Sequence, residues 1–139
     1  MALGPGKAFD MKLTLLRTLM ALPAVVFIVI GLRWLVAPDA SAAFFGMTIM
    51  EGLGLSTQIG DMAAIFLTLG LSVLAGLVSG KRTWFLVPSI FLVLVATARI
   101  LAWAFHGATF AADMIAQELL IAALWFFGSR FVCDTDDAA

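Results

Sequence analysis

Four long apolar stretches constrain the fold of this chain more than any other feature. They cover about residues 18–36, 59–79, 84–105 and 110–128, and each is bounded by charged residues, Gly or His. An α-helix rises 1.5 Å per residue, so the first stretch would be about 28 Å long, against about 30 Å for the hydrocarbon core of a bilayer. Each stretch can therefore cross a membrane as a single helix.

Composition agrees with a membrane location. Of the 139 residues, 63% are hydrophobic and only 12% are charged, whereas a soluble domain of this size carries about twice that charged fraction. We expect an all-α membrane protein, a bundle of four transmembrane helices whose surface is largely solvated by lipid. The chain has no basic stripe, so nucleic acid is not an expected partner.

A cleaved signal peptide is the competing interpretation of the first stretch. Residues 40–42, Ala-Ser-Ala, resemble a cleavage site behind a basic segment. However, the apolar run is longer than the hydrophobic region of a signal peptide, and Arg33 interrupts the approach to the site. We therefore divide the chain into an N-terminal segment (1–17), a transmembrane domain (18–128) and an acidic tail (129–139).

The distribution of basic residues predicts the orientation of the helices. Cytoplasmic segments of membrane proteins carry an excess of Lys and Arg. Six of the eight basic residues fall in segments that four helices would place on one side, namely Lys7, Lys12, Arg17, Lys81, Arg82 and Arg130. The N-terminal segment, the turn at 80–83 and the acidic tail should then be cytoplasmic, with residues 37–58 and 106–109 on the outer side.

The first outer segment contains a short sequence with helical features. Pro38 begins it, Phe44 and Phe45 follow, and Gly46 closes it. Proline favours the first position of a helix, and glycine favours the position just after one. We expect a short interfacial helix here, with an irregular loop carrying two lipid-facing Phe as the alternative, and a turn over residues 52–56 before the second span.

The aromatic residues follow a pattern typical of membrane proteins. The chain has twelve Phe, four Trp and no Tyr. Every Trp falls near the end of an apolar stretch, at Trp34, Trp84, Trp103 and Trp125. Because Trp is enriched where lipid meets water, we expect these four side chains to form a belt at the two interfaces.

Four ionisable residues lie inside the apolar stretches, at Arg33, Asp61, Arg99 and Glu118. An uncompensated charge in a membrane helix costs ~2.5–3.5 kcal/mol on insertion scales, so these side chains should face the bundle interior and find partners. All four fall in the outer half of the membrane. Their depths predict two ion pairs, Arg33 with Asp61 near the surface and Arg99 with Glu118 deeper.

Further polar residues surround this predicted cluster. Gln58 shares a helical face with Asp61, Asp113 shares one with Gln117, and His106 lies in an outer turn. The charges could serve only to hold four helices together. Alternatively, they could line a pocket for a polar headgroup or small anion, with acyl tails in the bundle. A proton or ion pathway is disfavoured because nothing polar continues toward the cytoplasmic side.

The sequence carries no catalytic, metal or nucleotide signature, which favours a non-enzymatic role. His106 is the only histidine, so a metal or catalytic site would need Asp113 or Glu118 beside it, and a structural interfacial histidine is the better interpretation. Cys133 is the only cysteine and cannot form an intrachain disulfide or a cysteine metal cage. We expect no metal and no cofactor other than a bound lipid or quinone.

Several short motifs resemble a known family. They are residues 31–35 (Gly-Leu-Arg-Trp-Leu) with Pro38, Gly46, residues 57–61 (Thr-Gln-Ile-Gly-Asp), Gly70, Lys81-Arg82, Arg99 and Glu118. Together they resemble the small bacterial membrane proteins of domain-of-unknown-function family 4345, which look distantly like the DoxX-like group. The resemblance implies a four-helix bundle of the bacterial inner membrane, with Arg33, Asp61, Arg99 and Glu118 as its polar core.

This family has no established reaction. Some DoxX-like relatives are linked to quinone-coupled sulfur oxidation, but the single cysteine here gives no support for that chemistry. The leading prediction is an accessory or structural subunit of a membrane complex, or a self-associating bundle. The alternative is a binder of a lipid or quinone-like ligand through the outer-leaflet cluster, with redox or carrier activity a distant third.

Overall fold

The computed structural model describes residues 5–133, and the regular structure in that range is entirely helical. The element order is α1 (Pro5–Val36), α2 (Pro38–Phe44), α3 (Gly52–Ser79), α4 (Thr83–His106) and α5 (Ala112–Val132). All but α2 are long and apolar enough to cross a membrane, which confirms the predicted four spans by length and composition.

Several helix boundaries lie beyond the predicted spans, whereas α5 begins two residues later than predicted. Residues 5–17, predicted as a separate segment, continue α1 toward its N-terminus. Gly80 and Gly107 adopt left-handed φ values of 71° and 67° and end α3 and α4, a conformation that glycine adopts without steric cost. Residues 38–44 are helical rather than an irregular loop, with Pro38 in the first turn of α2.

The predicted turn over residues 52–56 is wrong, because α3 already begins at Gly52. The side chain of Gln58, in the second turn of α3, fixes the loop that precedes this helix. Its Oε1 accepts a hydrogen bond from the Met50 main-chain N–H at 3.0 Å, and its Nε2 donates to the Thr48 carbonyl at 3.1 Å. The side chain thereby holds the loop against the helix that follows it.

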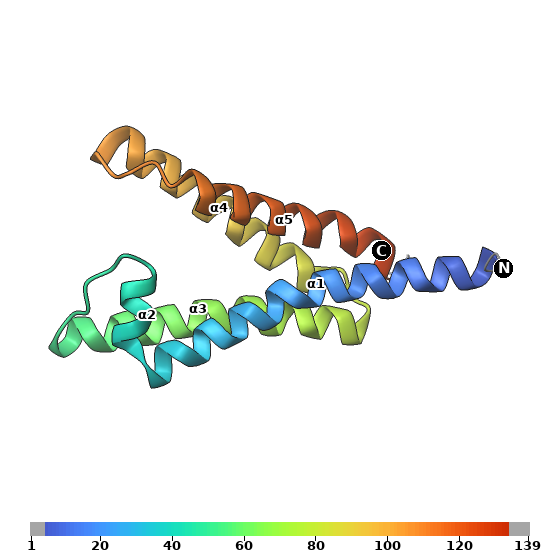
Figure 1. Ribbon diagram of the computed structural model, residues 1–139, viewed down its shortest axis with the longest axis horizontal. Coiled ribbons are helices and arrows are strands. Elements are labelled where there is room, and N and C mark those ends of the chain that lie inside the picture. Colours follow the sequence, from blue (N-terminus) through green and yellow to red (C-terminus); the bar gives the residue numbers. More distant parts are fainter. Residues whose placement is uncertain (1–4, 134–139) are drawn as a thin grey trace.

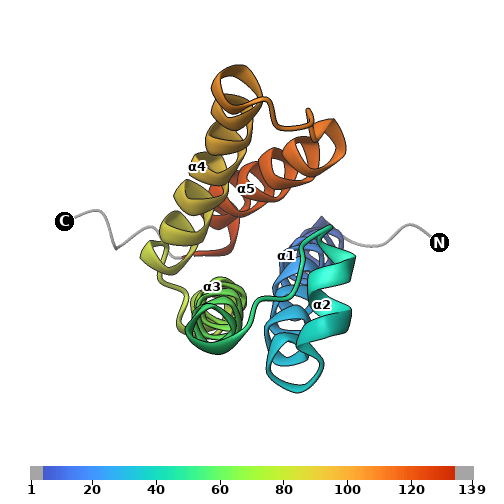
Figure 2. The same cartoon turned by 90° about the vertical axis from the view of Figure 1, so that its left-hand side faces the viewer.

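The helices form two hairpins, α1 with α3 and α4 with α5, whose internal packing is more extensive than the packing between them. Figure 1 shows the hairpins meeting near the α3–α4 turn and diverging toward α2. We call the first region the basic end, after Lys81, Arg82 and Arg130, and the opposite region the α2 end. Figure 2, seen from the α2 end, shows α4 and α5 set apart from α1, α2 and α3.

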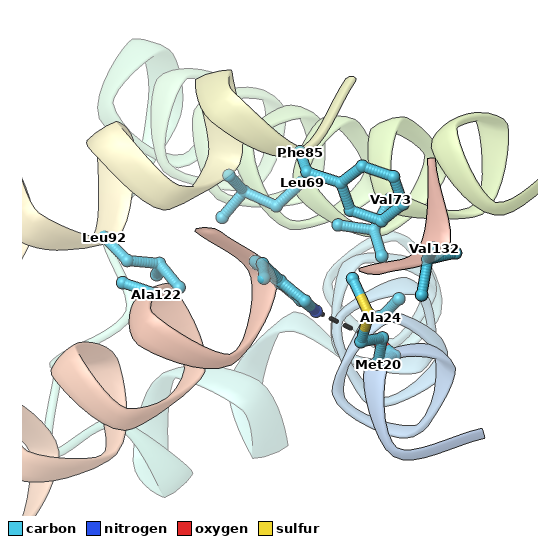
Figure 3. Packing of buried hydrophobic residues seen from close by; sticks show 9 residues of the cluster. Met20, Ala24, Leu69, Val73, Phe85, Leu92, Ala122 and Val132 are labelled. Carbon is cyan, nitrogen blue, oxygen red and sulfur yellow. Dashed lines mark hydrogen bonds between the residues drawn. The ribbon is translucent and has the colours of Figure 1, made fainter. Parts of the chain in front are cut away.

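The main hydrophobic core joins the two hairpins in the half of the molecule nearer the basic end (Figure 3). The Trp125 indole N–H on α5 donates to the Met20 carbonyl on α1 at 3.0 Å, the hydrogen bond dashed in Figure 3. All four long helices contribute buried side chains: Met20, Ala24, Leu69, Val73, Phe85, Leu92, Ala122, Trp125 and Val132.

A second, smaller core lies within the first hairpin and α2. Trp34, Ala42 and Ala63 are buried there. Close approach of α1 and α3 depends on glycine, since a Cβ on Gly70 would lie 2.5 Å from the Ala24 carbonyl oxygen. Small residues allow membrane helices to approach closely. This close packing holds the helices together, because lipid supplies no hydrophobic drive for their association.

The predicted belt of four Trp is wrong for two of them. Trp34 and Trp125 are fully buried, each filling one of the two cores. Trp84 and Trp103 are about half exposed, at 46% and 51%. Position along a helix places a Trp near a membrane surface, but the rotation of the helix decides whether its ring faces lipid or protein.

Candidate functional site

An ion pair between α4 and α5 is the first element of the candidate site. Arg99 Nε donates to Glu118 Oε1 at 2.8 Å, which confirms the predicted pairing of these residues. Arg99 lies seven residues before the end of α4, and Glu118 lies six residues after the start of α5. The short connection between the two helices therefore places both side chains at the same depth.

The ion pair leaves one carboxylate oxygen of Glu118 and the Nη donors of Arg99 without hydrogen bonds within residues 5–133. Glu118 Oε2 is buried and has no hydrogen-bond partner within residues 5–133. The two Nη groups of Arg99 likewise bond to nothing in that range, and the side chain keeps 35% of its surface exposed. Because a guanidinium carries five N–H donors, Arg99 can hold Glu118 and still bind a second acceptor.

Arg99 also lines a cleft between the two hairpins. The cleft has a volume of about 300 Å³, at the lower end of the range of roughly 300–1,000 Å³ found for small-molecule sites. It opens where the hairpins diverge toward the α2 end. Its lining is apolar apart from Arg99: Phe27, Phe45, Met47, Met62, Ile65, Phe66, Leu69, Phe91, Leu92, Val95 and Met114.

Aromatic rings form a continuous row along one wall of the cleft. Phe45 stacks on Phe66 with centroids 5.4 Å apart, and Phe66 meets Phe27 edge-on at 5.6 Å. Phe27 in turn meets the buried Trp125 edge-on at 5.6 Å, so the row ends in the main core. Rings held in this way give the cleft a wall that is apolar and already fixed in place.

The predicted pairing of Arg33 with Asp61 is wrong. Arg33 is exposed, donates to the Ala40 carbonyl at 3.2 Å, and lies over the Phe44 ring at 5.8 Å. Asp61 is also exposed and makes no ion pair with any residue in 5–133. The four charged residues therefore do not form one cluster, because α1 and α3 direct the side chains of Arg33 and Asp61 away from each other.

The other polar residues predicted around the cluster do not reach the cleft. Gln58 is buried, but both ends of its amide bond to the loop before α3. His106, Asp113 and Gln117 are exposed near the turn between α4 and α5 and do not line the cleft. Within residues 5–133 no group of three or more His, Cys, Asp and Glu side chains could hold a metal ion.

Apart from Arg99, the residues that line the cleft were not predicted as part of any site, and Phe45 and Met47 are the two that lie outside the long helices. They follow α2 and close the cleft from the side of the first hairpin. The pair of Phe at 44 and 45 was a sequence signal, but it was interpreted as part of a short interfacial helix, with two lipid-facing rings as the alternative. Only the fold shows that Phe45 faces Phe66 and Trp34 instead.

Comparison of the chain with protein-family models, with curated proteins and with solved structures gives no match. The similarity to family 4345 therefore stays a prediction from the motifs.

Proposed function

We propose that this chain is a multi-pass protein of the bacterial inner membrane that binds an amphiphilic molecule, a lipid or a quinone-like compound, in the cleft between its hairpins. The observation that carries the proposal is the position of Arg99. Its guanidinium is the only polar side-chain group among the described residues that line the otherwise apolar and aromatic cleft, and Glu118 holds it there by a 2.8 Å hydrogen bond.

Membrane energetics supports this role for Arg99. An ionisable side chain within a membrane helix is costly and commonly marks a functional site. Glu118 offsets part of the cost, but it occupies only the Nε donor of Arg99. The Nη donors suit an acceptor such as a quinone carbonyl, a carboxylate or a phosphate oxygen.

The apolar part of the cleft suits the rest of an amphiphile. The ring of Phe66, stacked on Phe45, offers a flat surface for a planar headgroup, while Met62 and Met114 can adapt to an irregular tail. Binding needs no catalytic group, in keeping with a non-enzymatic protein. The site would lie in the outer leaflet if the basic end faces the cytoplasm, as the positive-inside rule implies.

Identification of co-purified molecules tests this proposal. Organic extracts of the protein, purified in mild detergent, would be analysed by mass spectrometry for lipids and quinones. The substitution Ile65→Trp places a bulky ring in the cleft and should remove the retained molecule. The matched control is Leu71→Trp, on the same helix, 54% exposed and outside the cleft, which should retain it. Equal retention in both variants would contradict binding in the cleft.

A second candidate function, as a subunit of a membrane complex or of a homo-oligomer, is favoured by Asp61. This carboxylate is exposed on α3, two turns into an apolar helix, without an ion-pair partner in residues 5–133. Lipid contact would be costly for it, so a helix of another chain carrying a basic or hydrogen-bonding residue would stabilise it.

Chemical crosslinking in membranes followed by purification tests the subunit role. Wild-type protein should yield a stoichiometric partner or dimer, and Asp61→Asn should weaken it. Asp39→Asn, which changes an exposed acidic residue of α2, serves as the control and should leave the crosslink unchanged. A crosslinked product insensitive to Asp61→Asn would argue that this residue does not face a partner.

A further inference from the structure

A groove on the surface between α4 and α5 is distinct from the cleft between the hairpins. Its volume is about 360 Å³, and its lining is formed by Ser89, Ile90, Val93, Leu94, Leu119, Ala122, Ala123, Phe126 and Phe127. Ser89 is the only polar residue among them, and its hydroxyl already donates to the Phe85 carbonyl at 2.7 Å. The groove therefore presents an apolar surface.

The shape of the groove suits a single hydrocarbon chain. Ala122 and Ala123 are small and leave a trough between the larger side chains of the two helices. On α5 the lining runs from Leu119 to Phe127, nine residues that span about 12 Å along the helix axis. Its long axis is thus parallel to the helices, as an acyl chain would be in a bilayer.

Two arginines lie at the end of the groove nearest the basic end. Arg82, from the α3–α4 turn, places its guanidinium 5.5 Å from the centre of the Phe126 ring, and Arg130 of α5 lies 5.3 Å from the same centre. Arg130 is also 5.5 Å from the ring centre of Phe127. Both rings line the groove, so both positive charges lie close to its lining although neither arginine is part of it.

These arginines lack anionic partners in the part of the chain that the structure describes. Neither forms an ion pair within residues 5–133. The Nε of Arg82 is moreover buried without a hydrogen-bond partner, and a buried donor without an acceptor is unfavourable. An anion at the groove would supply the anionic partner that both guanidiniums lack within residues 5–133.

We propose that this groove binds an anionic phospholipid, with one acyl chain lying between α4 and α5 and the phosphate accepting hydrogen bonds from Arg82 and Arg130. Guanidinium groups bind phosphate oxygens through paired hydrogen bonds, and basic sites between membrane helices recognise anionic headgroups. The positive charges of Arg82 and Arg130 favour an anionic lipid as the occupant. An apolar helix of a partner protein would fill the trough but leave both guanidiniums without an anion.

Titration with two lipids tests the charge requirement. The full-length protein in neutral detergent would be titrated with dioleoyl phosphatidylglycerol or dioleoyl phosphatidylcholine, and binding followed by native mass spectrometry and thermal unfolding. The anionic lipid should bind at least tenfold more tightly than the zwitterionic one. Equal affinity for the two lipids would overturn the proposal.

Charge variants then test the two arginines. Arg82→Gln with Arg130→Gln should weaken phosphatidylglycerol binding at least tenfold. Lys12→Gln with Lys81→Gln removes the same charge from two exposed residues and should leave affinity within twofold of the wild type. Equal losses of affinity in the two double variants would mean that the lipid responds to the total positive charge of the protein and not to Arg82 and Arg130. That result would overturn the proposed site.

Filling the groove tests the acyl chain separately. Ala123→Trp should abolish the phosphatidylglycerol binding that depends on Arg82 and Arg130 although both arginines remain, whereas Leu120→Trp, on the same helix and 70% exposed outside the groove, should not. Retained binding in Ala123→Trp would overturn the assignment.

Discussion

The indole N–H of Trp125 on α5 donates to the main-chain carbonyl of Met20 on α1 at 3.0 Å, in the centre of the main core. This hydrogen bond is a direct polar contact between the two hairpins. It lies in the half of the molecule where they pack, whereas the cleft lies in the half where they diverge.

Removing this hydrogen bond should loosen the junction of the hairpins. Trp125→Phe keeps an aromatic ring but loses the N–H, and we expect a loss of about 0.5–1.5 kcal/mol in unfolding free energy beyond the effect of the smaller ring. Trp84→Phe, at a half-exposed position, should change stability far less. Thermal unfolding in detergent measures both, and equal losses would show that the bond contributes nothing measurable.

Gly70 should tolerate no side chain. A Cβ there would lie 2.5 Å from the Ala24 carbonyl oxygen and 2.6 Å from Ile28 Cγ1, so Gly70→Ala must push α1 and α3 apart. We expect a loss of about 1–3 kcal/mol, typical of overpacking. Gly60→Ala, on the same helix with nothing within 4 Å of its Cβ, should be neutral or stabilising because alanine favours helix. Similar unfolding midpoints for the two variants would contradict the close contact.

The pairing of Arg99 with Glu118 can be tested by a double-mutant cycle. Arg99→Leu leaves the mostly buried carboxylate of Glu118 without its partner and should cost about 1–3 kcal/mol. Adding Glu118→Leu removes the stranded charge and should recover part of the loss, giving a coupling energy of about 0.5–3 kcal/mol. Additive effects of the two substitutions would mean that the residues do not interact.

Gln58 should control the order of the loop between α2 and α3. Gln58→Leu removes both hydrogen bonds to that loop and should speed amide hydrogen exchange around Met50 and at the start of α3. Gln117→Leu, at an exposed position of α5, provides the control and should leave exchange in the loop unchanged. Unchanged exchange in Gln58→Leu would show that the loop is held by other contacts.

Depth within the membrane could be predicted from the sequence, and rotation about a helix axis could not. Counting residues from the turn placed Arg99 and Glu118 at one depth, and the short connection made them neighbours. The same count placed Arg33 near Asp61, yet Arg33 bonds to Ala40 and Asp61 faces away from it. In a helix of a soluble protein, the apolar face shows which side is buried. Here the side chains that face lipid and those that face the core are both apolar, so the sequence does not show how each helix is rotated.

The same limit explains why a ligand pocket could be offered as an alternative while the apolar lining of the cleft was not predicted. Phe27, Phe66 and Met62 line it, but their side chains do not differ in kind from exposed neighbours such as Leu22 or Leu71. Divergence of the two hairpins is a property of the whole packing arrangement. The single signal available in the sequence was Arg99, an arginine inside an apolar stretch, and it does line the cleft.

Native mass spectrometry of the wild type and of the Arg99→Leu, Glu118→Leu double variant tests whether Arg99 anchors a ligand in the cleft. The double variant removes the polar anchor without stranding a buried charge, so it can be compared as a folded protein. We predict that the wild type retains one lipid or quinone molecule in the cleft, besides any phospholipid in the groove between α4 and α5, and that the double variant loses that one molecule. The same adducts at the same occupancy in both proteins would contradict binding in the cleft, because Arg99 would then play no part in it.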